Sequence, residues 1–210
     1  MKRYKQFAVA GVALSTVGVL AGCGTVNTTT SGSTSTNTIN QAGTWKTYTN
    51  DRFGFSVEYP STWKTGPRSN DGDGRYFTTP SGMASFHNGY GLGVAKSDVM
   101  LVAVGTPNAV MGSGNGYNFK KMVAAFKGNI PNKRRQQRFI SESYTVVPNK
   151  WIVDTLVTKL GYGGIQYSEM YISLNTNQTI TMIFPESKSN VYLPIWNYVS
   201  KKFRPGNKSG

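Results

Sequence analysis

The sequence predicts an α+β domain in which helices pack on an antiparallel sheet. Apolar residues alternate with other residues from Phe53 to Tyr59, which is the period of a strand with one buried face. The apolar spacing changes to i, i+3, i+4 and i+7 from Phe119 to Phe126, which is the period of a helix with one buried face. Because consecutive strands joined by turns favour antiparallel pairing, and amphipathic helices need a sheet to cover them, a layered sandwich is expected.

The first half of this domain is expected to be built from strands and turns. Pro60 ends the first strand, and Trp63 is expected to fold back over the same core. The segment Asn70 to Gly74 is a turn by composition. Two short strands, Arg75 to Thr78 and Ala84 to His87, are expected around a Pro80-Ser81-Gly82 turn.

The second half is expected to contain two helices with strands between them. Asn118 is the expected N-cap of a helix that runs to Lys127. Strands are then expected around Arg138 to Val147, Trp151 to Leu160, Tyr167 to Leu174 and Thr179 to Phe184. In the last two strands the inward residues are expected to be Met170, Ile172 and Leu174, then Ile180, Met182 and Phe184. A closing helix is expected to bury Val191, Ile195, Tyr198 and Val199.

The N-terminal residues are typical of an exported lipoprotein. Lys2, Arg3 and Lys5 precede an apolar run from Phe7 to Leu20, which is shorter than the roughly 20 residues that a membrane-spanning helix needs. The run ends in Leu20-Ala21-Gly22-Cys23, which resembles the lipobox of bacterial lipoproteins. That resemblance implies that a signal peptide, residues 1–22, is removed and that Cys23 is lipidated, with two acyl chains giving stable anchoring.

Composition sets the remaining boundaries. Residues 23–43 follow the signal as a lipidated cysteine and a linker of mainly Ser, Thr, Asn and Gly, too polar to pack and therefore expected to be flexible. Residues 44–205 form the predicted domain and residues 206–210 a short tail. Cys23 is the only cysteine, so no disulfide can form within the chain. The expected location is extracytoplasmic, anchored to a membrane by lipid.

The start of the domain carries a distinctive motif, in which Tyr48 is followed after a short gap by Gly54 to Trp63, Gly-Phe-Ser-Val-Glu-Tyr-Pro-Ser-Thr-Trp. This segment resembles the opening of PsbP-like proteins, which have a Tyr, a short gap and the pattern Gly-Phe-Ser-hydrophobic-x-Tyr-Pro-x-x-Trp. The resemblance implies an α/β/α sandwich with a central antiparallel sheet, in a family whose members bind other proteins and are not enzymes. A lipid anchor replaces plastid targeting here, so the binding surface of the plant proteins is not carried over.

Three motifs suggest chemistry only weakly. His87 is the sole histidine, which excludes a metal site built on several histidines, and we expect it to be an exposed strand-end residue. The segment Asn70 to Gly74 resembles the start of a calcium loop but lacks its closing acidic residue, so a plain turn is expected. The glycine-rich segment Met111 to Tyr117 lacks the lysine of a P-loop. No catalytic residue, metal or cofactor is predicted.

The charge pattern gives the best candidate site. Three of the 23 cationic residues fall in the predicted leader, which leaves 20 against nine acidic residues, a net charge of +11. Such a surplus attracts anionic polymers and lipid headgroups. Nucleic acid is a weaker candidate because no reader motif accompanies the cations. The densest cationic cluster, predicted to bind a polyanion or a partner protein of the envelope, is Lys120, Lys121, Lys127, Lys133, Arg134, Arg135 and Arg138.

The leading functional interpretation is therefore a membrane-anchored, non-catalytic binding or assembly module. A solvated helix face is the simpler explanation of the cationic cluster. Two other functions remain open. Pairs of carboxylates on the predicted strands, drawn from Glu58, Glu142, Asp154 and Glu169, would suit a hydrolase of envelope polymers. A ligand-binding lipoprotein of a transporter would require two lobes around a cleft.

Overall fold

The computed structural model describes residues 43–87, 97–108, 118–135 and 138–208, which belong to one compact unit, Ser33–Gly210. Its helices are α2 (Pro80–His87), α3 (Phe119–Arg134) and α4 (Ser189–Lys202), and a 3-10 turn, η2 (Glu186–Lys188), leads into α4. Its strands are β1 (Trp45–Thr49), β2 (Ser56–Pro60), β3 (Lys64–Thr65), β4 (Gly74–Thr78), β5 (Met100–Pro107), β6 (Phe139–Val147), β7 (Trp151–Lys159), β8 (Gly164–Ile172) and β9 (Thr176–Pro185).

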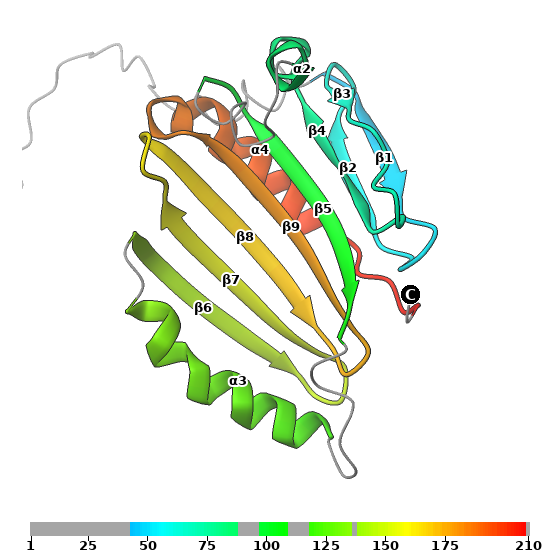
Figure 1. The fold of residues 1–210 in the computed structure, drawn as a ribbon, viewed down its shortest axis with the longest axis vertical. Coiled ribbons are helices and arrows are strands. Elements are labelled where there is room, and N and C mark those ends of the chain that lie inside the picture. The colour runs from blue at the N-terminus through cyan, green and yellow to red at the C-terminus, as the bar shows by residue number, and fades with distance from the viewer. Residues whose placement is uncertain (1–42, 88–96, 109–117, 136–137, 209–210) are drawn as a thin grey trace, which may run out of the picture. The chain divides into compact units, whose positions relative to one another are not determined.

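The described strands form two antiparallel sheets (Figure 1). The larger sheet has seven strands in the order β3-β4-β5-β9-β8-β7-β6, and β1 pairs with β2 in a separate two-stranded ribbon. Every described strand pair is antiparallel. The two edges of the large sheet differ, because β3 has only two residues whereas β6 has nine.

The helices α3 and α4 cover opposite faces of the large sheet. Ile152 of β7 lies opposite Ile172 of β8, and both pack against Met122 and Phe126 of α3. Alternate residues of β9 point to the other face, where Phe184 joins α4 in the main core. That core contains Ile180, Met182, Phe184, Tyr192, Ile195, Trp196 and Val199. These layers confirm the predicted α+β fold class with an α/β/α arrangement.

The N-terminal ribbon closes over α4. Phe53, Phe55 and Val57 are fully buried, and Trp63 packs against the same core, as predicted. The strand itself begins only at Ser56, so Phe53 and Phe55 lie in the β1–β2 connection that precedes it. Trp45 of β1 stacks on Tyr198 of α4 with ring centroids 4.0 Å apart. The ribbon therefore contributes the aromatic layer that seals the outer side of α4.

The predicted strand Arg75 to Thr78 is confirmed as β4, but the predicted turn at Pro80 and the second strand, Ala84 to His87, are wrong. The segment Pro80–His87 forms α2, and His87 is its last residue and not a strand end. Thr79 acts as the N-cap, since its hydroxyl accepts from the backbone N–H of Gly82 at 3.0 Å. Pro80 then occupies the first helical position, where a missing N–H has no cost. The Pro-Ser-Gly sequence that resembles a turn is thus the start of a helix.

Other elements match the predictions in place but differ in extent. Asn118 caps α3 as predicted, and its side chain accepts from the N–H of Lys121 at 3.0 Å, but the helix continues through Pro131 to Arg134. In α4, Val191 is exposed while Tyr192 and Trp196 are buried. No strand was predicted for β5, which lies inside the sheet between β4 and β9.

The two predicted inward sets face different layers. Met170 and Ile172 pack with α3, and Leu174 lies beside them. Ile180, Met182 and Phe184 pack with α4 on the opposite side of the sheet. Ile172, Ile180, Met182 and Phe184 are buried as predicted, whereas Met170 and Leu174 are only partly buried. The two sets differ in direction because the sheet is covered on both faces.

Gly206 fixes the segment that follows α4 against the N-terminal ribbon. Its N–H donates to Gln178 Oε1 at 2.7 Å, and its carbonyl accepts from Gln178 Nε2 at 2.9 Å. A Cβ atom at this position would collide with the carbonyl oxygen of Phe53 and with the backbone of Gly54 and Phe55. Only glycine permits this approach.

We expect Gly206→Ala to lower the free energy of unfolding by about 3 kcal/mol, because backbone atoms on both sides must shift. Urea denaturation measures the change. Gly128→Ala is the matched control, since Gly128 lies in α3 with no atom within 4 Å of its added Cβ, and it should stabilise by about 0.5 to 1 kcal/mol. Equal effects of the two substitutions would contradict this role for Gly206.

Candidate polyanion-binding surface

The helix α3 divides its residues between the sheet and solvent. Met122 and Phe126 are buried against the sheet. Lys120, Lys127 and Arg134 are spaced by seven residues, about two turns, so they lie on one outer face and span about 21 Å. All three are exposed, and Lys121 is exposed on an adjacent face. We call the exposed cations Lys120, Lys121, Lys127, Arg134 and Arg135 the α3 cationic face.

The position of two of these lysines is unfavourable for the helix itself. Lys120 and Lys121 lie in the first turn of α3, and no acidic residue is present there. The helix dipole disfavours cations at this end by about 0.3 to 1 kcal/mol each. Lys133 and Arg134 lie in the last turn, where the dipole favours them. The first-turn lysines are therefore not explained by the stability of the helix.

The sequence-predicted cluster does not form one uniform surface. Lys133 turns inward and its Nζ contacts Asp154 Oδ2 at 2.6 Å and Glu142 Oε1 at 3.3 Å. Arg134 Nε contacts Glu142 Oε2 at 3.4 Å. The Glu142 side chain has no exposed area and that of Asp154 is 5% exposed. Lys133 therefore contributes to the stability of the fold and is not available to a ligand. Its Nζ also lies 4.4 Å from the centre of the Phe126 ring.

The buried ion pairs change the protonation of Asp154. Burial raises the pKa of the Asp154 carboxyl above its ordinary value, and the neighbouring Glu142 adds to the rise, while the ammonium group of Lys133 opposes it. Asp154 Oδ1 has no hydrogen-bond partner among the described residues. The ion pair with Lys133 is therefore the main interaction that keeps this carboxyl ionised.

Arg135 and Arg138 lie beyond the last turn. Arg135 is the C-cap residue of α3 and is exposed. Arg138 is exposed at the start of β6, with a backbone φ of 82°, and its guanidinium lies beside Gly161 in the β7–β8 turn. Arg138 is thus separated from the α3 cationic face by residues 136 and 137, which lie outside the described part.

All nine carboxylates of the chain interact with described residues. Five accept from cations, in the ion pairs of Asp51, Asp73, Glu142, Asp154 and Glu186. Glu58 accepts from the hydroxyl of Tyr198, and Glu169 from that of Tyr171. The remaining two, Asp71 and Asp98, accept from backbone N–H groups or hydroxyls. None pairs with Lys120, Lys121, Lys127 or Arg135, so these positive charges face solvent without a counter-charge.

The carboxylates predicted as a candidate hydrolytic pair lie in three places. Glu58 is on the N-terminal ribbon, Glu169 faces the α4 layer, and only Glu142 and Asp154 lie together, on neighbouring strands. Lys133 bridges these two. A shallow cavity of about 210 Å³ beside Asp154 is walled mainly by Phe139, Leu156 and Met170.

The other motifs considered in the sequence give little support for a metal site or a catalytic site. Asp73 forms an ion pair with Arg52 at 2.6 Å, so a guanidinium occupies the side of the turn where a calcium ion was considered. Among the described residues no group of three or more His, Cys, Asp and Glu could hold a metal ion. Cys23, the predicted signal peptide and the Met111 to Tyr117 segment lie outside the described residues, as does the His87 side chain. The lipidation of Cys23 stays a prediction.

Two features escaped the sequence interpretation. Asp98 accepts hydrogen bonds from Thr79, from Ser81 at 2.6 Å, from Tyr192 at 2.8 Å and from the N–H of Val99 at 2.8 Å. Its partners lie up to 94 residues away, so no local pattern reveals it. The second feature is a hollow at one end of the sheet, described below.

Comparisons with known proteins give a likeness of fold only. No protein-family model matches the chain, and no curated protein matches it. The solution structure of a cyanobacterial PsbP from Synechocystis sp. PCC 6803 is similar, with 11% identity, a TM-score of 0.45, and coverage of 89% of this chain and 98% of that one. A Pseudomonas aeruginosa protein of unknown function has 11% identity and a TM-score of 0.39, covering 79% of this chain and 100% of that one.

No helix among the described residues is long and apolar enough to cross a membrane.

Proposed function

We propose that this chain is a lipid-anchored, non-catalytic binding module that recognises a phosphate-rich polyanion of the cell envelope through the α3 cationic face. The observation that carries the proposal is the charge of α3, which has six cations with its C-cap and no acidic residue. Four of these cations have no carboxylate partner, because all nine carboxylates interact elsewhere.

The physical argument rests on where the charges are placed. A cation near an anionic surface contributes about 1 kcal/mol, so the exposed lysines alone could supply about 3 kcal/mol. Lys120 and Lys121 oppose the helix dipole, which suggests that they are present for a ligand. The predicted lipid at Cys23 and the predicted flexible linker would hold this surface within a few nanometres of the membrane, about 5 to 6 Å times the square root of the linker length.

The two rival functions have less support. In a hydrolase, two carboxylates would converge on a cleft and remain free to act, whereas Glu142 and Asp154 are bridged by Lys133. In a transporter-linked binding protein, two lobes would flank a cleft. The described residues instead surround one continuous seven-stranded sheet.

The test is a triple charge reversal, Lys120→Glu with Lys121→Glu and Lys127→Glu, in the full chain held in an uncharged detergent. Binding to soluble polyphosphate at low salt should weaken by at least about 100-fold, since about 3 kcal/mol is lost. The free energy of unfolding should rise by about 1 kcal/mol, because two acidic residues then complement the helix dipole. Fluorescence anisotropy measures the first quantity and urea denaturation the second.

A matched control shows whether binding depends on the position of the lysines or only on the net charge of the protein. Reversal of Lys46, Lys64 and Lys201, which are exposed and form no ion pair with a described residue, changes the net charge equally. If this control loses as much affinity as the α3 variant, binding is non-specific and the proposal fails. Vesicles of anionic phospholipid form a second arm, and preference for vesicles over polyphosphate would reassign the ligand to the membrane surface.

A further inference from the structure

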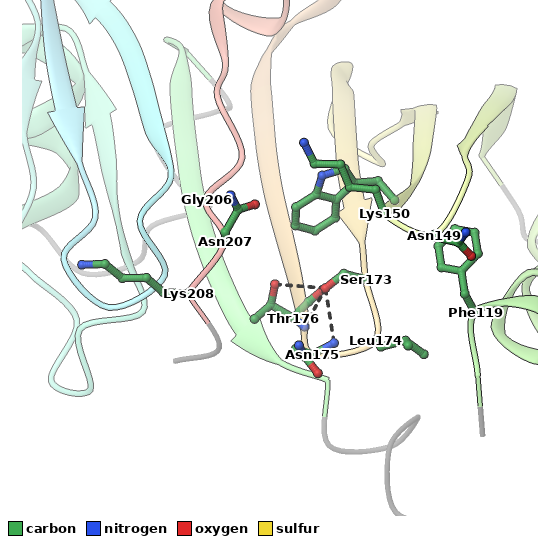
Figure 2. Close-up of a pocket in the computed structure, with 11 residues that line it drawn as sticks. Phe119, Asn149, Lys150, Ser173, Leu174, Asn175, Thr176, Gly206, Asn207 and Lys208 are labelled. Atoms are coloured by element: carbon green, nitrogen blue, oxygen red, sulfur yellow. Dashed lines mark hydrogen bonds between the residues drawn. The ribbon is translucent and has the colours of Figure 1, made fainter. Parts of the chain in front are cut away.

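A hollow of about 210 Å³ lies where two turns of the sheet meet the segment after α4 (Figure 2). Asn149 and Lys150 reach it from the β6–β7 turn, and Ser173 to Thr176 from the β8–β9 turn. Gly206 to Lys208 close the side nearest the N-terminal ribbon, where Gly206 is fixed by its two hydrogen bonds to Gln178. The backbone around the hollow is therefore held in place from three directions.

Hydrogen-bond donors dominate the polar lining. No carboxylate lines the hollow, whereas Lys150 and Lys208 both do. Lys208 Nζ donates to the carbonyl oxygen of Asp51 at 2.8 Å, and the ammonium group of Lys150 has no partner among the described residues. The side-chain amides of Asn149, Asn175 and Asn207 are likewise without a partner in the described part of the chain. A ligand that supplies acceptors and negative charge would satisfy this set.

The turn between β8 and β9 is organised by its own hydrogen bonds. Ser173 Oγ accepts from the N–H of Asn175 at 3.3 Å and of Thr176 at 3.0 Å, as the dashed lines in Figure 2 show. Because the serine hydroxyl orders the turn, the exposed Asn175 side chain projects from a fixed backbone. The polar groups at this position are thus pre-arranged for a ligand.

Trp151 forms part of the apolar wall of the hollow. Trp151 is 5% exposed, and its indole N–H has no acceptor among the described residues. The ring is held edge-on to Tyr171, with centroids 6.1 Å apart. Phe119 and Leu174 complete the apolar lining. The indole N–H is buried and does not open onto the hollow, so Trp151 contributes ring surface and not a donor.

We propose that the hollow binds a single phosphate group carried on a short carbon frame. The unpaired ammonium group of Lys150 favours an oxyanion, and the three amides add neutral donors. The volume lies below the roughly 300 Å³ of pockets that hold drug-sized ligands, so only a small group fits. The apolar walls would receive the carbon frame. This site is separate from the α3 cationic face, none of whose residues lines it.

The test uses 19F NMR of the full chain labelled with 5-fluorotryptophan, which gives one signal for each of the four tryptophans. Trp151→Phe identifies the signal of the hollow. Inorganic phosphate and glycerol phosphate are titrated separately, against chloride at matched ionic strength. We expect a saturable shift of the Trp151 signal, with glycerol phosphate binding several-fold more tightly than inorganic phosphate.

Two variants with intact folding locate the effect. Lys150→Ser should weaken phosphate binding about tenfold, because Lys150 is exposed and supplies an unpaired charge to the hollow. Lys127→Ser on α3 should leave the affinity of the hollow for phosphate unchanged. No shift beyond that of chloride, or equal affinity in Lys150→Ser and the parent, would overturn the proposal. Equal affinity for the two phosphates would overturn the carbon-frame assignment. The triple charge reversal on α3 distinguishes the two sites. If that variant no longer binds polyphosphate but still shows the shift of the Trp151 signal with phosphate, the two sites bind independently.

Discussion

Replacing Asp98 by alanine is expected to lower the free energy of unfolding by about 4 kcal/mol. The carboxylate is 8% exposed and accepts four hydrogen bonds that join the start of α2, the start of β5 and Tyr192 of α4. A hydrogen bond to a charged group contributes about 1.5 to 3 kcal/mol, and neighbouring bonds do not add fully. The alanine variant also leaves the buried Tyr192 hydroxyl without its acceptor. Urea denaturation at neutral pH measures the loss.

The pH dependence of the loss identifies its cause. Burial raises the pKa of Asp98, but the hydrogen bonds from Ser81, Thr79, Val99 and Tyr192 outweigh burial and hold the pKa below its ordinary value. A carboxyl with a lowered pKa in the folded state stabilises the protein above its unfolded pKa, about 4, and loses that contribution as the pH falls. The difference in the free energy of unfolding between the parent and Asp98→Ala should therefore become smaller as the pH falls. A difference that is constant from pH 7 to pH 3 would contradict this account.

Replacing Lys133 by alanine should cost about 3 kcal/mol at pH 7. Removal of the ammonium group leaves Asp154 without a cation and leaves Glu142 with only the longer contact to Arg134. An uncompensated buried charge typically costs about 3 to 5 kcal/mol, and the lower value applies because Lys133 is 23% exposed. Chemical denaturation with circular dichroism detection provides the measurement.

The control for Lys133 is a neighbour on the same helix. Lys127→Ala removes an exposed lysine without an ion pair and should change stability by no more than about 0.5 kcal/mol. The cost of Lys133→Ala should rise with pH, because burial already raises the pKa of Asp154 and an acid with a raised folded pKa destabilises the fold as it ionises. Similar costs for the two variants would show that the buried ion pairs contribute little.

The fold could be predicted where each segment carries its own periodic signal. The alternation from Phe53 to Tyr59 correctly predicted which side chains are buried, although the strand begins only at Ser56, and the helical spacing after Asn118 proved correct. The β5 strand was missed because Met100 to Val104 is a nearly continuous apolar run without alternation, as expected for a strand covered on both faces. The segment Pro80–His87 was mistaken for part of a hairpin because Pro and Gly occur in turns and also at the start of helices.

The candidate site was only partly visible in the sequence. A run of cations is apparent along the chain, but which of them face solvent depends on partners from other strands. Lys133 is turned inward by Asp154, 21 residues away. The hollow beside Lys150 is also lined by Gly206 and Lys208, which lie more than 50 residues further along the chain. Contacts between distant segments leave no local pattern, so composition and periodicity cannot predict them.

The contact between the N-terminal ribbon and the segment after α4 bears on when the domain can close. Ser56 of β2 forms a bridge with Arg204, and Gly206 packs on the backbone of Phe53 to Phe55, about 150 residues away. The ribbon therefore cannot reach its final position until Arg204 and Gly206 are available. Contacts between segments so far apart form late in folding. If the predicted signal peptide directs the chain across a membrane, the domain would stay open until its C-terminal residues emerge and would close only on the far side.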